Sequence, residues 1–423
     1  MTEKLQVTGF LTIKKAHLEI KKINIIIGPQ ANGKSLLAKL LHFFKTINEE
    51  FFEGIRLNKS KRDFDKGIIT AFEEKFPRYT WEGSSFSIIY DLDEINIKII
   101  GRKNSSGKTS LTINYSPLIA KIFTNKKKVY IKHLAEIKTT EKPGRPQFAF
   151  AESQVFFEHV IEPLRREDYS SFFSNPIFIP ATRSFFANLQ KNYWSLTDDI
   201  LDIDPLISRF GKSYDNAKNL YNIISKHDVF KPKVDVSNCL NEVIKAEYQE
   251  IDGDDWIVND SYKVRLSRAS SGQQEAFPML LILMMNNYRI AGLNFHSMYI
   301  EEPEAHLFPD AQAKVVSAIL KIFSKQDTNF FITTHSPYIL TSINNSIYAN
   351  QLIESGKVTE EKFVDISNGS YPINFSDISA YSITKGQITD IKDYELNLID
   401  GTFLDSISNN FGKIFNQLLD LDS

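Results

Sequence analysis

Residues 25–41 read IIIGPQANGKSLLAKLL, and this stretch constrains the fold more than any other part of the chain. It contains the pattern G-x-x-x-x-G-K-[ST] from Gly28 to Ser35, preceded by isoleucines typical of a buried strand and followed by apolar residues at helical spacing. Backbone N–H groups at such a helix start can surround phosphates, Lys34 can neutralise their charge and Ser35 can bind Mg²⁺. The residues predicted to form this nucleotide site are Gly28, Asn32, Gly33, Lys34, Ser35 and Leu36.

A second stretch, residues 99–113, reads IIGRKNSSGKTSLTI and imitates this motif. Five residues separate Gly101 from Gly107, whereas four separate Gly28 from Gly33. The residues that follow alternate between apolar and polar, which predicts a strand and not the helix whose N–H groups would bind phosphate. We therefore expect a polar hairpin turn here. Its tip carries the basic residues Arg102, Lys103 and Lys108.

Composition limits the class of protein. With 42% hydrophobic and 24% charged residues among 423, the chain can bury a large core as an ordinary globular protein. Its net charge of −2 provides no overall basic field for nucleic acid. Lysines are nevertheless concentrated in residues 121–145, which we interpret either as a solvated face or loop or as a local contact for DNA. The single cysteine, Cys239, excludes a disulfide framework and fits a reducing compartment. No stretch is long and apolar enough to span a membrane, so we expect a cytoplasmic protein.

The order of predicted elements indicates an α/β fold. Alternating runs predict strands over 5–13, 16–20 and 23–27 and an antiparallel meander over 80–116. Mainly helical patterns follow over 151–250, interrupted by one buried strand, and a hairpin lies near 248–260. Strand, helix and strand between 297 and 337 predict parallel pairing. Two small strands (379–386 and 388–393) and a helix (405–421) end the chain. The predicted segments are 1–150, a helical insertion lobe 151–260, a second part of the nucleotide-binding domain 261–350, and a C-terminal extension 351–423.

Polar residues follow both strands of the predicted parallel pair. Adjacent carboxylates at the end of a buried strand are costly unless a metal ion or a water molecule requires them, so Glu301 is a candidate Mg²⁺ ligand and Glu302 a candidate base. His335 follows the next strand and could donate to a γ-phosphate, because parallel strands present their ends to one crevice. The alternatives are an acidic surface turn and a structural histidine.

A helix is predicted to begin near residues 269–275, which read ASSGQQE. Serine hydroxyls and free N–H groups at a helix start suit an anion, and an ordinary N-cap is the alternative. The candidate residues are Ser270, Ser271, Gly272 and Gln273.

In this order, the four motifs resemble those of the ATP-binding-cassette class of P-loop ATPases. The Walker A motif would be Gly28 to Ser35, the signature loop Ser270 to Gln273, the Walker B motif Glu301 and Glu302, and the switch histidine His335. EEPEAHLFP, ITTHSP and FIPATRS look like the branch containing RecF, SMC-type proteins and the OLD-family ATPases. The resemblance covers roughly residues 1–45 and 175–345. It implies Glu302, His335 and Lys34 as catalytic residues and adds Arg183 to the nucleotide-binding residues.

The resemblance also implies partners and cofactors. It implies a homodimer, or a higher oligomer of dimers, in which Ser271 and Gly272 of one chain face ATP and Mg²⁺ held by Lys34 of another. Two residues depart from the pattern: Glu301 replaces the usual aspartate, and the signature reads Ser-Ser-Gly-Gln. Three glutamines are weak candidates for the usual Q-loop: Gln147, Gln154 and Gln190.

Many OLD-family chains continue into a Toprim nuclease domain, but the residues after His335 contain no convincing Asp-x-Asp pair. We therefore expect a sensor or regulator of a separate effector, a nuclease or toxin, of the kind found in bacterial anti-phage systems. The alternative is a RecF- or SMC-like repair ATPase that contacts DNA through residues 102–145. A transporter subunit fits poorly because Lys34 and Gly272 lie 238 positions apart, and a P-loop kinase leaves the signature and His335 unexplained.

Overall fold

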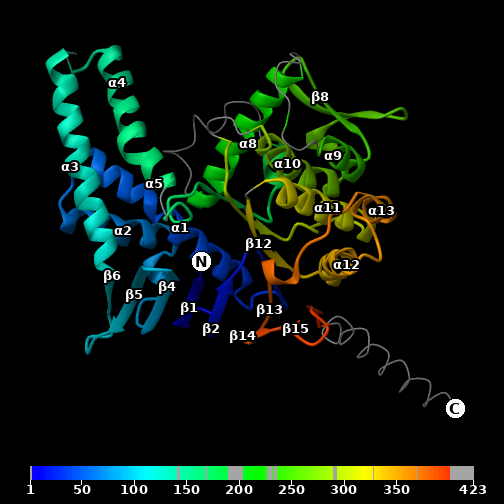
Figure 1. Cartoon of the computed structure of the whole chain (residues 1–423), viewed down its shortest axis with the longest axis horizontal. Helices are drawn as coiled ribbons and strands as arrows, with labels where there is room; N and C mark the ends of the chain where they lie inside the picture. The colour runs from blue at the N-terminus through cyan, green and yellow to red at the C-terminus, as the bar shows by residue number, and fades with distance from the viewer. Residues whose placement is uncertain are drawn as a thin grey trace.

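The computed structural model describes residues 2–140, 143–166, 169–188, 203–225, 232, 236–288, 293–326, 328–367 and 369–400. An 11-stranded mixed sheet forms the centre of the molecule, in the order β6-β5-β4-β1-β2-β14-β13-β3-β12-β11-β7 (Figure 1). The predicted α/β class with a mixed sheet is confirmed. Its strands are β1 (Glu3–Phe10), β2 (Ile13–Ile20), β3 (Ile23–Ile27), β4 (Phe86–Leu92), β5 (Ile95–Lys103), β6 (Thr109–Tyr115), β7 (Pro176–Ile179), β11 (Ser297–Glu301), β12 (Asn329–Thr334), β13 (Ile378–Thr384) and β14 (Gln387–Asp390).

The sheet has an antiparallel half and a parallel half. Strands β6, β5, β4, β1 and β2 pair antiparallel, whereas β13, β3, β12, β11 and β7 are all parallel. The two halves meet at β14, which pairs antiparallel with β13 and parallel with β2. The predicted C-terminal strands therefore exist, but they lie in the middle of the sheet, beside the strand that leads into the glycine-rich loop.

Two turns decide the hairpins of the antiparallel half. The expected single strand over 5–13 is wrong, because Leu11 has a φ of 50° and closes a tight turn between β1 and β2. The second Gly-Lys-Thr stretch forms the predicted hairpin, since β5 pairs with β6 and Lys103 lies opposite Thr109. Gly107 has a φ of 83° in the connecting turn. No helix follows Lys108, so this loop lacks the N–H groups of a phosphate site.

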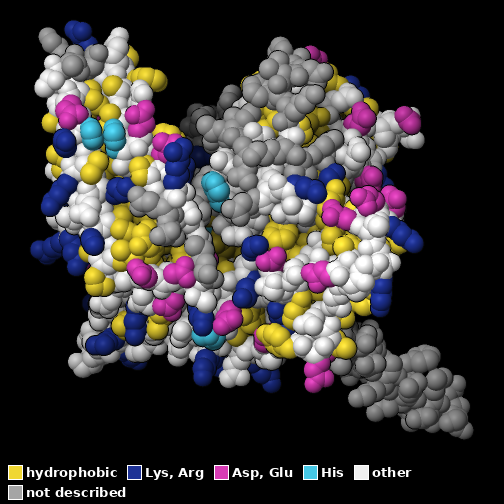
Figure 2. All heavy atoms as spheres, viewed as in Figure 1, with side chains coloured by type: hydrophobic (Ala, Val, Ile, Leu, Met, Phe, Trp, Pro, Cys, Tyr) yellow, Lys and Arg dark blue, Asp and Glu magenta, His cyan; other side chains and the backbone are white. Residues whose placement is uncertain are grey.

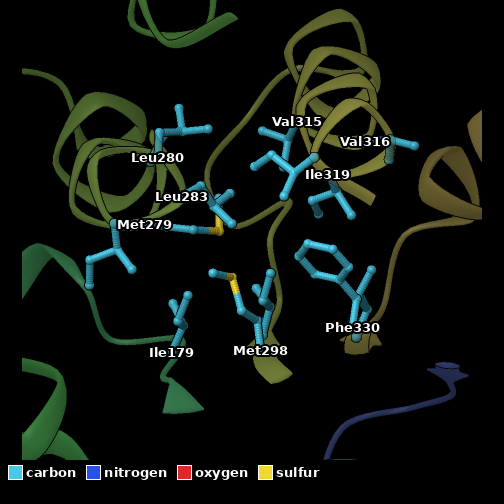
Figure 3. Packing of buried hydrophobic residues seen from close by; sticks show 14 of the residues in the cluster. Ile179, Met279, Leu280, Leu283, Met298, Val315, Val316, Ile319 and Phe330 are labelled. Atoms are coloured by element: carbon cyan, nitrogen blue, oxygen red, sulfur yellow. The ribbon is translucent and has the colours of Figure 1, made fainter. Parts of the chain in front are cut away.

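Helices cover both faces of the sheet. Along β11, Met298 and Ile300 face one hydrophobic cluster and Tyr299 faces the other, as alternation along a strand buried on both faces requires. Helices α1 (Lys34–Arg56) and α2 (Lys61–Lys75) belong to the cluster of Tyr299. The opposite cluster includes α6 (Ser184–Asn188), α8 (Pro205–Ile224), α9 (Ser237–Ile244), α10 (Ser271–Asn286), α11 (Pro309–Lys325) and α12 (Pro337–Glu354). Figure 3 shows how α10 and α11 pack on the strands through Met279, Leu280, Leu283, Val315, Val316 and Ile319.

A helical arm projects from the sheet next to β6 (Figure 1). It consists of α3 (Pro117–Thr140), α4 (Pro146–Phe156), the π-helical turn η2 (Phe157–Ile161) and α5 (Glu162–Arg166). Residues 121–140 of the lysine-rich stretch therefore lie on a helix, α3. Helix α3 follows one end of β6, whereas the hairpin turn beside Arg102 and Lys108 precedes the other end. The length of β6 therefore separates the basic residues of the turn from those of the helix.

The helices expected over 151–250 are present, but they belong to two parts of the structure. Those up to Arg166 lie in the helical arm, and those from α6 onward pack on the main sheet. The strand within them, β7, pairs with β11 in the main sheet, and α8 and α9 belong to the same hydrophobic cluster as α10. The four segment boundaries stay a prediction, and the C-terminal helix predicted over 405–421 lies outside the described residues. The other elements are η1 (Arg78–Thr80), β8 (Glu247–Ile251), β9 (Asp254–Val258), β10 (Lys263–Arg265), η3 (Leu266–Arg268), α13 (Glu360–Ile366), η4 (Phe375–Asp377), β15 (Lys392–Asp393) and β16 (Leu398–Ile399). None of the described helices has both the length and the apolarity that a membrane span needs.

Candidate functional site

The glycine-rich loop connects β3 to α1 in the way that phosphate binding requires. Helix α1 begins at Lys34, and no side chain caps its first N–H groups, so these donors are available to an anion. Gly33 precedes the helix with a φ of 103°, and a Cβ there would lie 2.3 Å from Ile13 Cδ1. Gly28 is equally constrained, because a Cβ would lie 2.3 Å from the backbone oxygen of Ile383. Gly33 is therefore favoured by its left-handed backbone conformation, and Gly28 is required by the close packing of the backbone at Ile383.

The turn between β13 and β14 braces the loop from the side. Asn32 Oδ1 accepts a 2.6 Å hydrogen bond from the Lys385 N–H, and its Nδ2 donates to the Gln30 carbonyl. The Gly386 carbonyl in turn accepts from the N–H of Lys14. Asn32, predicted to bind nucleotide, thus has its side chain engaged in shaping the loop, and Leu36 lies half-buried one residue beyond Ser35. The sequence does not predict this contact, since no residue near Lys385 indicates that its turn lies beside the glycine-rich loop.

The Lys34 side chain folds back over its own loop. Its Nζ donates to the carbonyls of Gly28 at 2.7 Å and Pro29 at 2.9 Å, and it lies 3.3 Å from His335 Nδ1. Burial lowers the pKa of Lys34, and the carboxylates of Glu302, Glu304 and Glu301 act in the opposite direction. The ammonium group is thus held at the mouth of the loop by neutral carbonyls, which a phosphate could replace as its partners.

Glu302 and His335 meet above the carboxyl ends of two adjacent strands. Glu302 has a φ of 43°, and its N–H donates to the Thr333 carbonyl at 2.8 Å, which joins the ends of β11 and β12. Its Oε1 lies 3.1 Å from His335 Nε2. The structure therefore brings Lys34, His335 and Glu302 into one continuous chain of contacts, with both carboxylate and imidazole still partly exposed to solvent.

Glu301 lies deeper than Glu302 and is 8% exposed. Its Oε2 accepts from the Ala181 N–H at 3.3 Å, whereas Oε1 has no hydrogen-bond partner among the described residues. Burial raises the pKa of Glu301, while the Ser35 hydroxyl and the Lys39 ammonium favour the ionised form. An orphaned buried carboxylate oxygen beside a serine hydroxyl is a donor set that fits Mg²⁺.

Glu304 is a site residue that the sequence reasoning missed. Its Oε1 accepts from Thr334 Oγ1 at 2.7 Å and from the His335 N–H at 2.6 Å, and its Oε2 is buried without a hydrogen-bond partner among the described residues. The carboxylate therefore fixes the backbone that carries His335. The sequence contains a signal for Glu304, which is the third acid of the EEPE stretch. The prediction is limited to Glu301 and Glu302 at the strand end and therefore leaves Glu304 out.

Arg183, which the resemblance adds to the nucleotide-binding residues, has a side chain that is 0% exposed. Nη1 donates to the carbonyl of Glu301 at 2.6 Å, Nη2 donates to that of Glu302 at 2.9 Å, and Nε donates to that of Glu275 at 2.9 Å. These donors are thus directed at backbone carbonyls behind the turn at Glu301 and Glu302, and nucleotide binding by Arg183 stays a prediction.

The signature-like segment begins helix α10. Ser270 Oγ accepts from the Gln273 N–H, and Gln273 Oε1 accepts from the Ser270 N–H, so the two form a capping box. Gln273 Nε2 also donates to the Ile244 carbonyl at 2.7 Å. Ser270 and Gln273 thus serve the cap, while Ser271 is exposed and Gly272 half-buried at the helix start. Within the described residues, no hydrogen bond joins this segment to the glycine-rich loop of the same chain.

The Q-loop glutamine remains unassigned. Gln147 and Gln154 lie on α4 in the helical arm, where Gln154 Nε2 donates to Glu158. Gln190 lies outside the described residues.

A family model described as an AAA ATPase domain matches residues 161–340, which include the signature segment, the two strand-end acids and His335 but not the glycine-rich loop. The structure brings the strand-end acids and the histidine of this matched segment next to the glycine-rich loop, which lies outside it. No curated protein matches the sequence.

Several solved structures are similar at low sequence identity. An Smc head bound to the C-winged helix domain of ScpA is 12% identical, with a TM-score of 0.41, over 93% of this chain and 98% of that chain. An SMC head domain from Thermotoga maritima is 10% identical, with a TM-score of 0.36, over 93% of this chain and 99% of that chain. A nucleotide-free ATP-binding cassette from an ABC transporter is 12% identical, with a TM-score of 0.32, over 93% and 92% of the two chains.

Proposed function

We propose that the chain hydrolyses ATP with Mg²⁺, that two copies enclose two ATP molecules, and that this cycle regulates a separate effector in bacterial anti-phage defence, a nuclease or toxin. The observation that carries the ATPase proposal is the contact chain from Lys34 through His335 to Glu302, beside the uncapped start of α1. These contacts support the proposal because a cation, an imidazole and a carboxylate side by side are the groups that ATP hydrolysis needs around a γ-phosphate and its attacking water.

Lys34, His335 and Glu302 would each have a role in the reaction. Lys34 exchanges its carbonyl partners for phosphate oxygens when ATP enters the loop. Glu302 orients the attacking water and accepts its proton, and His335, released from Lys34, donates to the γ-phosphate. Glu301 and Ser35 are the residues that would hold Mg²⁺, which supplies charge neutralisation between the phosphates when it is bound.

The dimer proposal is supported by what the site lacks within one chain. The exposed hydroxyl of Ser271 and the start of α10 make no hydrogen bond to the glycine-rich loop of the same chain in its described residues. A helix N-terminus with an exposed serine suits the γ-phosphate held by a second copy. The resulting two-fold arrangement would complete both sites at once.

Direct action on DNA is the second candidate, and the surface of the arm favours it. Figure 2 shows lysine and arginine side chains spread along the arm. The exposed lysines of α3 are Lys121, Lys128, Lys132 and Lys138. If they bind duplex DNA, affinity will fall steeply with salt because phosphate contacts release counterions. A salt-independent affinity would exclude this function and leave the regulator proposal in place.

The ATPase proposal is tested with two variants that separate binding from completion. Lys34→Ala should lose ATP binding, because it removes the cation of the loop. Ser271→Arg should still bind ATP, since exposed Ser271 makes no hydrogen bond to the glycine-rich loop within the described residues, but it should fail to dimerise and to hydrolyse. Hydrolysis by the Ser271→Arg chain at the wild-type rate would contradict completion by a second copy.

A further inference from the structure

We infer that Arg183 and Glu275 couple the two ATP sites of the dimer, because they join the signature helix of each chain to the Walker B turn of the same chain. The inference rests on the proposed dimer and goes beyond it. The start of α10 would face the ATP held by the partner copy, whereas the side chains of Glu301 and Glu302 face the chain's own glycine-rich loop. A rigid connection between them makes the geometry of one site depend on the occupancy of the other.

The connection consists of one buried guanidinium and its partners. Arg183 donates to both carbonyls of the Walker B turn, Glu301 O at 2.6 Å and Glu302 O at 2.9 Å. On its other side it holds α10, through Nε to the Glu275 carbonyl at 2.9 Å and through its backbone N–H to Glu275 Oε2 at 2.8 Å. Glu275 lies four residues after Ser271, about one helical turn into α10. Both side chains are buried, so water cannot replace these contacts when the helix moves.

A second contact joins the same two segments. A Cβ at Gly272 would lie 2.7 Å from the His306 carbonyl, so the backbone of the signature segment packs directly on the turn that follows Glu302. That turn is itself held by hydrogen bonds from Ala305 N to the Glu302 carbonyl and from Leu307 N to the Glu304 carbonyl. A displacement at the start of α10 therefore reaches the catalytic turn both through the backbone contact and through the arginine.

The geometry of arginine is essential to this role. A planar guanidinium can hold two carbonyls of the turn and one of the helix at the same time, whereas the single ammonium of a lysine keeps the charge without this fork. Glu275→Gln keeps an acceptor for the Arg183 N–H and removes the charge beside the guanidinium. The two substitutions thus loosen the connection from opposite ends and leave Lys34 and its loop untouched.

The experiment compares Arg183→Lys and Glu275→Gln with the wild type and with Arg78→Lys, an exposed arginine that pairs with Glu82 at 2.6 Å far from the site. Melting temperature and ATP affinity of the monomer check the fold and the loop. The hydrolysis rate is then measured against ATP concentration. We expect a Hill coefficient above one in the wild type and the control and a coefficient near one in both variants, because the coupling of two sites appears as cooperativity.

The outcomes separate this inference from the proposed function. Unchanged cooperativity in both variants overturns the coupling, as does loss of monomer ATP binding together with a lower melting temperature, which would show a structural role only. A wild-type chain that does not hydrolyse ATP refutes the proposed function instead. In that case the cooperativity of ATP binding in the Glu302→Gln chain, with and without Glu275→Gln, still tests the coupling, and equal binding curves contradict it.

Discussion

Replacement of Glu304 by alanine should lower the free energy of unfolding, because one carboxylate oxygen of Glu304 accepts two hydrogen bonds at the end of β12. In the wild type, Glu304 Oε1 accepts from Thr334 Oγ1 at 2.7 Å and from the His335 N–H at 2.6 Å. Alanine would leave both donors unsatisfied, and each buried unsatisfied donor costs about 1–3 kcal/mol. The expected loss in the free energy of unfolding is therefore about 2–6 kcal/mol. Glu304→Gln keeps an acceptor in place, so it should lose less.

A matched control is available in Glu354→Ala. Glu354 Oε1 also accepts two hydrogen bonds, from Asn350 and Asn374, but both are exposed. Water replaces such contacts, so this variant should change stability by no more than about 0.5 kcal/mol. Urea denaturation of the three variants and the wild type gives the comparison. Equal losses in Glu304→Ala and Glu354→Ala would refute the claim that Glu304 stabilises the end of β12 through its hydrogen bonds to Thr334 and His335.

Three further predictions concern the glycine-rich loop and the end of helix α2. Gly28→Ala should destabilise the protein by about 1–3 kcal/mol in urea denaturation, because the new Cβ would meet the Ile383 carbonyl at 2.3 Å; unchanged stability would contradict the close packing. Lys34→Ala should abolish ATP binding in calorimetry without unfolding the chain, and measurable affinity would assign phosphate binding elsewhere. Burial lowers the pKa of Lys75 from 10.5 to about 8 beside a cavity of about 220 Å³. Between pH 8 and pH 10.5 the unfolded chain binds more protons than the folded one, so the free energy of unfolding of the wild type should rise with pH over this range. Lys75→Met should remove this pH dependence and raise the free energy of unfolding by up to about 3 kcal/mol at pH 7. A wild-type free energy of unfolding that falls from pH 8 to pH 10.5 would refute the lowered pKa of Lys75.

Local patterns predicted the parts of the site that depend on neighbours in the chain. The strand, loop and helix around Gly28 to Ser35 follow from hydrophobic spacing and two glycines, and the hairpin at Gly107 follows from alternation after the turn. The parallel pairing of β11 and β12 followed from the intervening helix and brought Glu302 close to His335.

Features that depend on distant segments could not be predicted. The pairing of β13 with β3 joins residues more than 350 positions apart, and no local signal distinguishes a central strand from a peripheral one of the same length. The partners of Arg183 come from two distant segments, α10 and the end of β11, so its sequence position indicates neither its burial nor the carbonyls that it holds. For Glu304 the local signal existed, but only the fold shows that its carboxylate faces the His335 backbone.

The central claim is that two copies of the chain close around ATP, and the mass of the Glu302→Gln chain in solution tests it most directly. This substitution removes the proposed base while leaving Lys34 and the start of α1 intact, so ATP should be bound and not consumed. Light scattering after size-exclusion chromatography should give 48.5 kDa for the chain without nucleotide and twice that mass with ATP and Mg²⁺. A mass that stays at one chain with ATP bound, or a Glu302→Gln chain that hydrolyses ATP at the wild-type rate, would contradict the account.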